Sequence, residues 1–153
     1  MNNISVRKGD YLLTTDQAIF DFDKIYEFIA KQSYWAEGIP FSTLKKSVSN
    51  SLSFGLFYKE SQIGFARVVT DYATFGYLAD VFIVPEYRGK GLAHWLMENI
   101  LSHPELQGLR RWMLATRDAH GLYEKYGFKP LSKPDRMMEI THADIYKTGP
   151  GKT

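Results

Sequence analysis

Residues 78–93 read LADVFIVPEYRGKGLA and hold three features that together could bind an anion. The apolar run from Val81 to Val84 is typical of a strand, and Pro85 ends it because proline lacks the N–H that a sheet needs. A glycine-rich turn follows, and apolar residues at helical spacing begin at Leu92. The first N–H groups of a helix have no partner within it and lie at the positive end of its dipole. The sequence therefore predicts a phosphate or pyrophosphate site at this turn.

The glycines and basic residues of the turn allow two interpretations. Gly89 and Gly91 either supply the positive φ of a plain strand-to-helix turn or let the backbone approach a pyrophosphate closely. Gly91 and Ala93 are small, which leaves room for phosphates beside the start of the helix. The side chains of Arg88 and Lys90 either contact phosphate or face solvent.

Asp80 places a carboxylate inside the same apolar run, on the strand face that it shares with Phe82 and Val84. A carboxylate among apolar residues requires either a partner or a function. It either takes the proton of an attacking amine, directly or through water, or it pairs with a basic residue of a neighbouring strand such as Arg67. The residues alone leave both interpretations open.

The chain around these residues alternates between strands and helices. Two consecutive strands at 52–58 and 64–69 are joined by a tight turn, which predicts antiparallel pairing. The order of elements predicts an α/β fold of the α+β kind, with one central mixed sheet, mostly antiparallel and flanked by helices. The other expected elements are a short strand or a hairpin at 4–14 with its turn at Gly9 and Asp10, helices at 21–31, 42–49 and 118–126, a helix from Leu92 that ends at His103, and strands at 76–84, 110–115, 128–131 and 137–140.

Length and composition predict a single domain over residues 1–153, with a frayed end from about residue 147. A net charge of +2 gives no field that would attract nucleic acid or a membrane surface. The absence of cysteine excludes disulfides, a thiolate nucleophile and thiolate metal ligands. The histidines show no ligand spacing, so we expect no metal. The chain shows no signal segment and no apolar run of membrane length, and we expect a cytoplasmic protein.

Two motifs, together with the order of the expected elements, resemble the GNAT superfamily of acyl-CoA N-acyltransferases. The first, Arg/Gln-x-x-Gly-x-Gly/Ala after a strand, falls on Arg88, Gly91 and Ala93. The second, Asn-x-x-Ala followed by Leu-Tyr-x-x-x-Gly-Phe, matches TRDAHGLYEKYGF at residues 116–128, with threonine at its first position. The resemblance is strong over residues 50–132 and extends to the N-terminal third only through the order of the elements. Two motifs in the right order are far more specific than one glycine motif.

The resemblance implies a binding site for acetyl-CoA. In this family the strand before the turn splays from the next one, and its free backbone groups pair with the pantetheine arm. An N–H near Phe82 or Ile83 would also stabilise the oxyanion of the thioester. Thr116 stands where an asparagine usually positions pantetheine, and the Tyr123 phenol would protonate the leaving thiolate. The implied CoA-binding residues are Phe82, Ile83, Val84, Arg88, Gly89, Lys90, Gly91, Leu92, Ala93, Thr116 and Tyr123.

Tyr34, Trp35 and Phe41 lie in or beside the loop that joins the first two expected helices. In the family this region forms a wall of the acceptor site, and an aromatic wall suits an apolar or aromatic amine or the stem of a lysine-like chain. The alternative is that Trp35 covers the core.

We therefore expect an N-acetyltransferase that moves an acetyl group from acetyl-CoA to a primary amine of a small molecule or peptide. Transfer would be direct, in a ternary complex, because there is no cysteine to carry the acyl group. Tyr123 is the expected general acid and Asp80 a candidate base. The alternatives are a non-catalytic acyl-CoA-binding regulatory module and a nucleotide-binding module unrelated to CoA. The partners would be acetyl-CoA and an amine, and the resemblance leaves a homodimer open.

Overall fold

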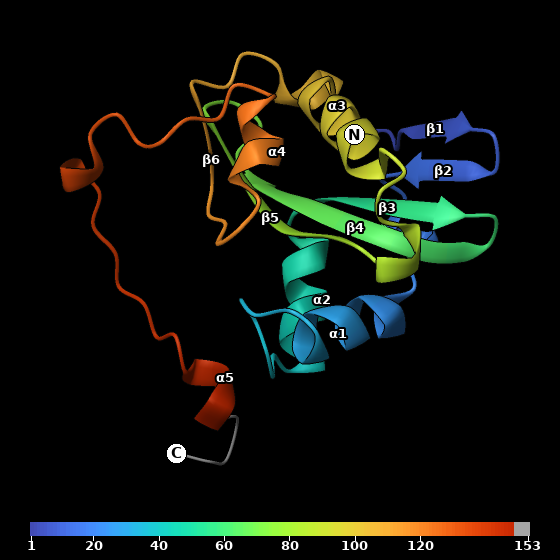
Figure 1. Cartoon of the computed structure of the whole chain (residues 1–153), viewed down its shortest axis with the longest axis horizontal. Coiled ribbons are helices and arrows are strands. Elements are labelled where there is room, and N and C mark those ends of the chain that lie inside the picture. The colour runs from blue at the N-terminus through green and yellow to red at the C-terminus, as the bar shows by residue number, and fades with distance from the viewer. Residues whose placement is uncertain (149–153) are drawn as a thin grey trace.

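The computed structural model describes residues 1–148 and contains one six-stranded sheet in the order β1-β2-β3-β4-β5-β6 (Figure 1). Neighbouring strands are antiparallel except β5 and β6, which are parallel. The fold is thus mixed α/β and mostly antiparallel, as the sequence predicts. The strands are β1 (Ser5–Lys8), β2 (Tyr11–Thr14), β3 (Leu52–Tyr58), β4 (Ser61–Thr70), β5 (Phe75–Ile83) and β6 (Arg111–Leu114).

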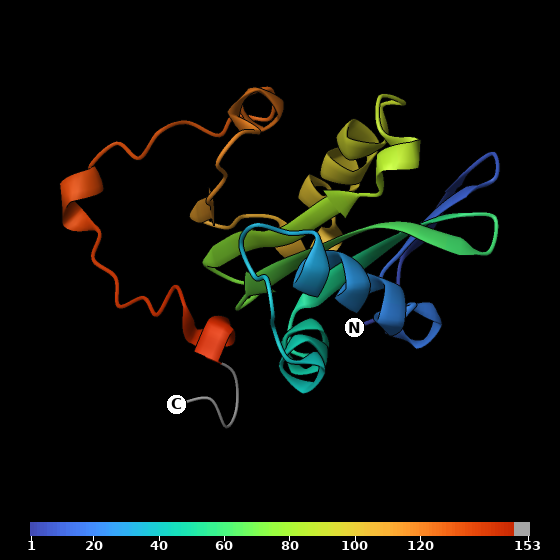
Figure 2. The ribbon, with the colours of Figure 1, turned by 60° about the horizontal axis from the view of Figure 1, so that its bottom comes forward.

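Helices cover both faces of this sheet (Figure 2). On one face lie α1 and α2, and on the other lies α3, which begins directly after the glycine turn (Figure 1). No helix within residues 1–148 is long and apolar enough to cross a membrane. The helices are α1 (Phe22–Lys31), α2 (Phe41–Ser49), α3 (Leu92–Leu101), α4 (His120–Glu124) and α5 (Ile145–Thr148), with 3₁₀ turns η1 (Gln17–Ile19), η2 (Pro85–Tyr87), η3 (Pro104–Leu106) and η4 (Pro134–Arg136).

Local sequence accounts for the start of several elements. The β1–β2 hairpin turns through Gly9 and Asp10, and the φ of +60° at Gly9 suits a residue without a Cβ. Helix α1 begins where the Asp21 side chain accepts a hydrogen bond from the Lys24 amide at 3.0 Å. Helix α2 begins at Phe41, after Pro40, one residue earlier than expected.

The core lies between the sheet and its helices. Phe28 of α1 stacks on Phe82 of β5 with ring centroids 4.0 Å apart, which ties the helix to the strand that precedes the glycine turn. Leu96 and Ile100 of α3 are fully buried on the other face. These contacts hold the end of β5 and the start of α3 in fixed positions, which is what a binding turn between them requires.

Strands β5 and β6 pair only along the first part of β5. The register runs from Phe75 opposite Arg111 to Leu78 opposite Leu114, and β5 then continues to Ile83 without a strand on that edge. A bulge in the pairing of β4 with β5 coincides with Asp80, whose φ is +55°. The strands therefore splay, as the resemblance implies, and one edge of β5 is left open.

The two C-terminal strands expected at 128–131 and 137–140 are wrong. Their residues form no strand, and all residues from 129 to 145 are exposed. A short stretch with apolar residues becomes a strand only if it reaches a sheet edge, and this segment runs outside the sheet instead. Helix α4 is also shorter than the 118–126 expected. The expected fraying concerns mostly residues 149–153, which lie outside the described residues, whereas residues 147 and 148 belong to α5.

Candidate active site

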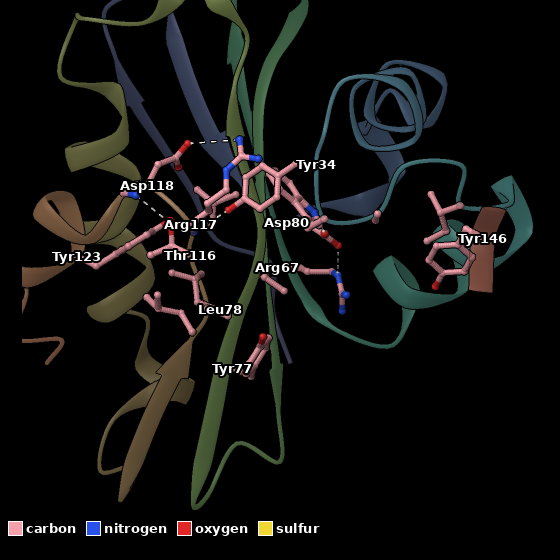
Figure 3. Close-up of a pocket in the computed structure, with 18 residues that line it drawn as sticks. Tyr34, Arg67, Tyr77, Leu78, Asp80, Thr116, Arg117, Asp118, Tyr123 and Tyr146 are labelled. Atoms are coloured by element: carbon pink, nitrogen blue, oxygen red, sulfur yellow. Dashed lines mark hydrogen bonds and ion pairs between the residues drawn. The ribbon is translucent and has the colours of Figure 1, made fainter. Parts of the chain in front are cut away.

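A cavity of about 660 Å³ opens where β5 and β6 separate (Figure 3). The loop after α1 contributes Tyr34, β5 contributes Asp80, and the loop after β6 contributes Thr116. Tyr123 of α4 lies at one side of the cavity, and Tyr146 of α5 lies at the opposite side. Segments far apart in the sequence therefore converge on one space, at the edge of β5 that has no partner strand.

The turn between β5 and α3 offers unpaired backbone donors. Gly89 and Gly91 have φ values of +75° and +78°, so both supply the positive φ that this turn between strand and helix needs. Within residues 1–148, the amides of Gly89, Lys90 and Gly91 donate to no protein acceptor. A Cβ built on either glycine would meet no atom within 4 Å, so the space in front of these amides is open. Such a loop of free N–H groups before a helix suits a phosphate.

Arg88 has a different role in the turn from its neighbours. Its Nε donates to the Ile83 carbonyl at 2.8 Å, and its amide donates to the Pro85 carbonyl at 3.2 Å. The side chain therefore closes the turn onto the end of β5, and the backbone N–H is already used. Lys90 is exposed, and Leu92 and Ala93 form the first turn of α3.

The backbone amides do not all point the same way in Phe82 and Ile83, which end β5, and in Val84, which directly follows it. The Val84 amide donates to the Ile63 carbonyl of the neighbouring strand at 2.8 Å. Because backbone groups alternate along a strand, the Phe82 N–H also faces β4, whereas the Ile83 N–H faces the open edge of β5. Of the three, Ile83 is therefore the residue whose amide is placed to bond a ligand. The alternation of backbone groups along a strand identifies Ile83 only once it is known which edge of β5 is paired with β4.

Asp80 forms an ion pair with Arg67, which was the second interpretation of this residue. The Arg67 Nε lies 2.6 Å from Asp80 Oδ2, and the two side chains are 18% and 8% exposed. The Trp35 indole N–H donates to the other carboxylate oxygen at 2.7 Å. Both oxygens of Asp80 thus have partners, and the left-handed backbone at the bulge is held from two directions. This arrangement favours a positioning role for Asp80 over that of a base.

We expect Asp80→Ala to lower the free energy of unfolding by about 3 kcal/mol, because it strands the Arg67 charge in a largely buried site. The matched control is Asp118→Ala, which removes a carboxylate that also lines the cavity but is 65% exposed, with its oxygen 3.7 Å from Arg117. That change should cost no more than ~1 kcal/mol. Urea unfolding of both variants measures the difference, and equal losses would contradict a structural role for the Asp80 pair.

Tyr123 is buried and remains protonated at neutral pH. Tyr123 is 8% exposed. Burial, with a smaller contribution from Tyr34, raises the pKa of the Tyr123 phenol to about 12. The loop before α4 is closed by Thr116, whose Oγ1 accepts from the Ala119 amide at 3.0 Å. The Thr116 hydroxyl keeps its own hydrogen for another acceptor. A neutral phenol at the cavity wall is a proton donor rather than a base.

The aromatic loop after α1 reaches across the cavity at two points. Tyr34 Oη accepts from the Arg117 amide at 2.9 Å, and the Arg117 guanidinium lies 3.8 Å from the centre of the Tyr34 ring. Trp35 reaches Asp80 from the same loop. Phe41, in contrast, packs edge-to-face on Tyr26 with centroids 5.3 Å apart and does not line the cavity. The structure therefore brings two of the three expected acceptor residues to the site.

Several cavity residues did not emerge from the sequence. Arg117 directly follows Thr116 and could have been found by its position after a strand end. Tyr146 carried no such signal, because α5 reaches the cavity through a long connection. Among the described residues, no three His, Cys, Asp or Glu side chains are grouped to hold a metal ion.

Comparison with known proteins gives one consistent result. A family model described as "Acetyltransferase (GNAT) family" matches residues 22–128. A candidate acetyltransferase of Gibberella zeae is 34% identical over 94% of this chain and 92% of its own length. The [ribosomal protein bS18]-alanine N-acetyltransferase of Haemophilus influenzae is 32% identical over 71% of this chain and 75% of its own length.

Solved structures agree with this result. The crystal structure of a candidate GNAT-family acetyltransferase from Xanthomonas campestris pv. campestris has 44% identity and a TM-score of 0.89, covering 90% of this chain and 97% of that one. A more distant structure from Clostridium acetobutylicum, determined with acetyl-CoA, has 15% identity and a TM-score of 0.60 over 92% of this chain and 95% of that one. The Clostridium structure therefore shares the fold of this chain.

Proposed function

Because this chain belongs to the GNAT family of acetyltransferases, we propose that it transfers an acetyl group from acetyl-CoA to a primary amine of a small molecule or peptide. Transfer is direct, within a ternary complex, since the chain has no cysteine to carry the acyl group. One observation carries the proposal: a single cavity joins the open edge of β5 to a buried, protonated tyrosine.

The residues present fit acetyl-CoA at two places. The free amides of residues 89–91 and the open space beside them suit a diphosphate. The unpaired edge of β5 suits an extended amide chain such as pantetheine, which would bond it as an added strand. Thr116 stands on the opposite wall, where its hydroxyl is free to donate. Bound there, acetyl-CoA would supply the activated acyl group for the transfer.

The chemistry needs an oxyanion donor, a proton donor and a positioned amine. The amine nitrogen forms a bond to the thioester carbonyl carbon, and the Ile83 N–H donates to the oxygen that gains negative charge. The carbon–sulfur bond then breaks, and Tyr123 gives its proton to the sulfur. The amine loses one proton to water, and the phenolate recovers one from water. Asp80 holds the bulge of β5 in place through its bonds to Arg67 and Trp35.

The pH dependence of kcat should show no falling limb from Tyr123 below pH ~10, because an acid with a pKa of about 12 keeps its proton throughout that range. Stability behaves differently. The unfolded phenol ionises near pH 10, before the folded one at about 12, so the free energy of unfolding falls as the pH rises between these values. Tyr123→Phe should show a shallower decline, because it loses this contribution while Tyr72 and Tyr126, whose pKa values are also raised by burial, remain. Parallel unfolding curves for the two proteins at alkaline pH would contradict the burial of an ionisable phenol.

Release of free thiol from acetyl-CoA, measured with a panel of amines, tests the function itself. The panel should include small apolar and aromatic amines, polyamines and a peptide that begins with alanine. The last is included because the Haemophilus relative is named for an alanine of a ribosomal protein. We expect at least one acceptor to raise thiol release well above the rate in buffer. A rate equal to buffer with every amine, together with tight CoA binding, would identify a non-catalytic acyl-CoA-binding module instead.

A further inference from the structure

Arg67 of β4 lines the active cavity with part of its hydrogen-bonding capacity unused (Figure 3). Its Nε donates to Asp80 Oδ2 at 2.6 Å, and its Nη1 donates to Ser51 Oγ at 3.1 Å. A guanidinium carries more N–H donors than these two bonds use, and within residues 1–148 the Nη2 group has no protein acceptor. His103 Nε2 is the only side-chain polar atom in that range that is both buried and unpartnered, so Arg67 Nη2 stays open to solvent. These donors are therefore available to a ligand in the cavity.

The charged groups around the cavity offer donors more than acceptors. Both oxygens of Asp80 already accept hydrogen bonds, from Arg67 and from Trp35. The carboxylate of Asp118 lies 3.7 Å from the Arg117 guanidinium and is 65% exposed, so water and salt screen it. Each carboxylate thus lies beside an arginine, whereas the Arg67 guanidinium has N–H groups left over. A ligand group that accepts hydrogen bonds and carries negative charge suits this wall better than a cation does.

The sheet places a second donor on the same wall as Arg67. Arg67 pairs with Ala79 across β4 and β5, and Val69 pairs with Tyr77 in the same register. Paired residues and residues two apart share one face of a sheet, so Tyr77 lies on the same face as Arg67. The Tyr77 phenol also lines the cavity, and within the described part of the chain its hydroxyl bonds to no protein group. Opposite the arginine, Ala79 contributes only a methyl group to the wall.

We propose that the acceptor amine of this protein also carries a carboxylate, which Arg67 binds with Tyr77 as a second donor. The inference rests on the proposed function, because it names the class of acceptor for the same cavity. The planar fork of a guanidinium matches a carboxylate, and Asp80 and Ser51 hold the Arg67 fork in a fixed orientation. An arginine fixed in this way loses little freedom when a ligand binds. The acceptor is therefore an amino acid or a short peptide with a free C-terminus.

The position of Arg67 also limits where the amine lies. Arg67 is opposite Ala79, and the Ile83 amide that would bind the oxyanion is up to roughly 13 Å further along β5. The arginine side chain and the acceptor together span this distance. Acceptors that differ in the separation of amine and carboxylate therefore report on the geometry of the site.

Matched pairs of acceptors test the class of substrate. Each pair is an acid and its carboxamide, and the acids are phenylalanine, 6-aminohexanoate and the dipeptide of two alanines. We expect the acid of at least one pair to exceed its amide in kcat/KM by ~10-fold or more, as hydrogen bonds between charged groups imply. Amine basicity works in the opposite direction, because a nearby carboxylate keeps the amine protonated and unreactive. Thiol release in which every amide equals or exceeds its acid would overturn the proposal.

Substitutions at the two donors locate the carboxylate. Arg67→Lys keeps a positive charge beside Asp80 but loses the fork, and it should lower the acid-to-amide ratio of kcat/KM by about 10-fold. Tyr77→Phe should lower this ratio by about threefold, and because it removes only a hydroxyl it tests the site even if Arg67→Lys folds poorly. The matched control is Arg117→Lys, at the 65% exposed arginine of the same cavity, whose ratio should stay within about twofold of wild type. An unchanged ratio in both donor variants, or an equal loss in the control, would refute the assignment.

Calorimetry separates this inference from the proposed function. The titrants are the N-acetylated acid and the N-acetylated amide of each pair, added to the protein saturated with CoA. At least one acid should bind the wild-type protein ~10-fold or more tightly than its amide, and Arg67→Lys should remove that difference. If no amine releases thiol but an acid still binds in preference to its amide, the proposed function fails and the carboxylate site stands. If amides are acetylated as readily as acids and bind equally well, the function stands and the carboxylate site fails.

Discussion

Tyr123→Phe lowers kcat by about 10²-fold while leaving the affinity for CoA nearly unchanged, which is the expected result for loss of a general acid. The phenol lies at the cavity wall and keeps its proton because burial raises its pKa to about 12. Phenylalanine keeps the ring that packs on Phe128 and removes only the hydroxyl. The leaving thiolate must then take its proton from water.

The control for this change is Tyr126→Phe, the same substitution three residues further on. The Tyr126 hydroxyl contacts His94, at 2.9 Å from the ring Nδ1, and it does not line the cavity. Its loss should leave kcat within about twofold of wild type, since surface changes away from the site are small. Steady-state kinetics with a saturating amine, and CoA affinity by calorimetry, separate the two variants. If Tyr123→Phe turns over at the wild-type rate, the acid is another group or water.

Gly91→Trp should abolish CoA binding without unfolding the protein. The indole would occupy the open space in front of the free amides, where the diphosphate is expected to lie. The backbone cost is separate from this effect, because any side chain at a φ of +78° is strained by roughly 1–2 kcal/mol. We therefore expect a stability loss of that size together with a loss of affinity of at least ~100-fold, as removal of the phosphate contacts implies.

Gly108→Trp separates the loss of CoA binding from the effect of backbone strain. Gly108 has the same φ of +78° and also has nothing within 4 Å of a built Cβ, but it lies in the loop before β6, away from the glycine turn. The two variants should lose similar stability in thermal unfolding, and only Gly91→Trp should lose CoA in calorimetry. Wild-type affinity in Gly91→Trp would remove the diphosphate from this turn. Equal loss of affinity in both would indicate a general effect of strain.

The sequence by itself determined the features that depend on near neighbours. The turn at Gly9 and Asp10 and the strand-turn-helix around Gly91 follow from φ and residue spacing within a few positions. The antiparallel pairing of β3 with β4 followed as well, because a short connection favours antiparallel neighbours. These local rules were sufficient to predict one mixed, mostly antiparallel sheet and the position of the glycine turn, but they also predicted two C-terminal strands that do not form.

Only the tertiary structure decided which groups face one another. Asp80 had two interpretations until Trp35, 45 residues away, and Arg67 on the adjacent strand were seen to bond both of its oxygens. The direction of the Ile83 amide could be assigned only when it was known which edge of β5 is paired with β4. The apolar pattern at residues 137–140 predicted a strand, but a pattern specifies only a capacity to pair, and pairing requires an edge within reach. Contacts between distant segments depend on how the whole chain packs, and no local spacing encodes them.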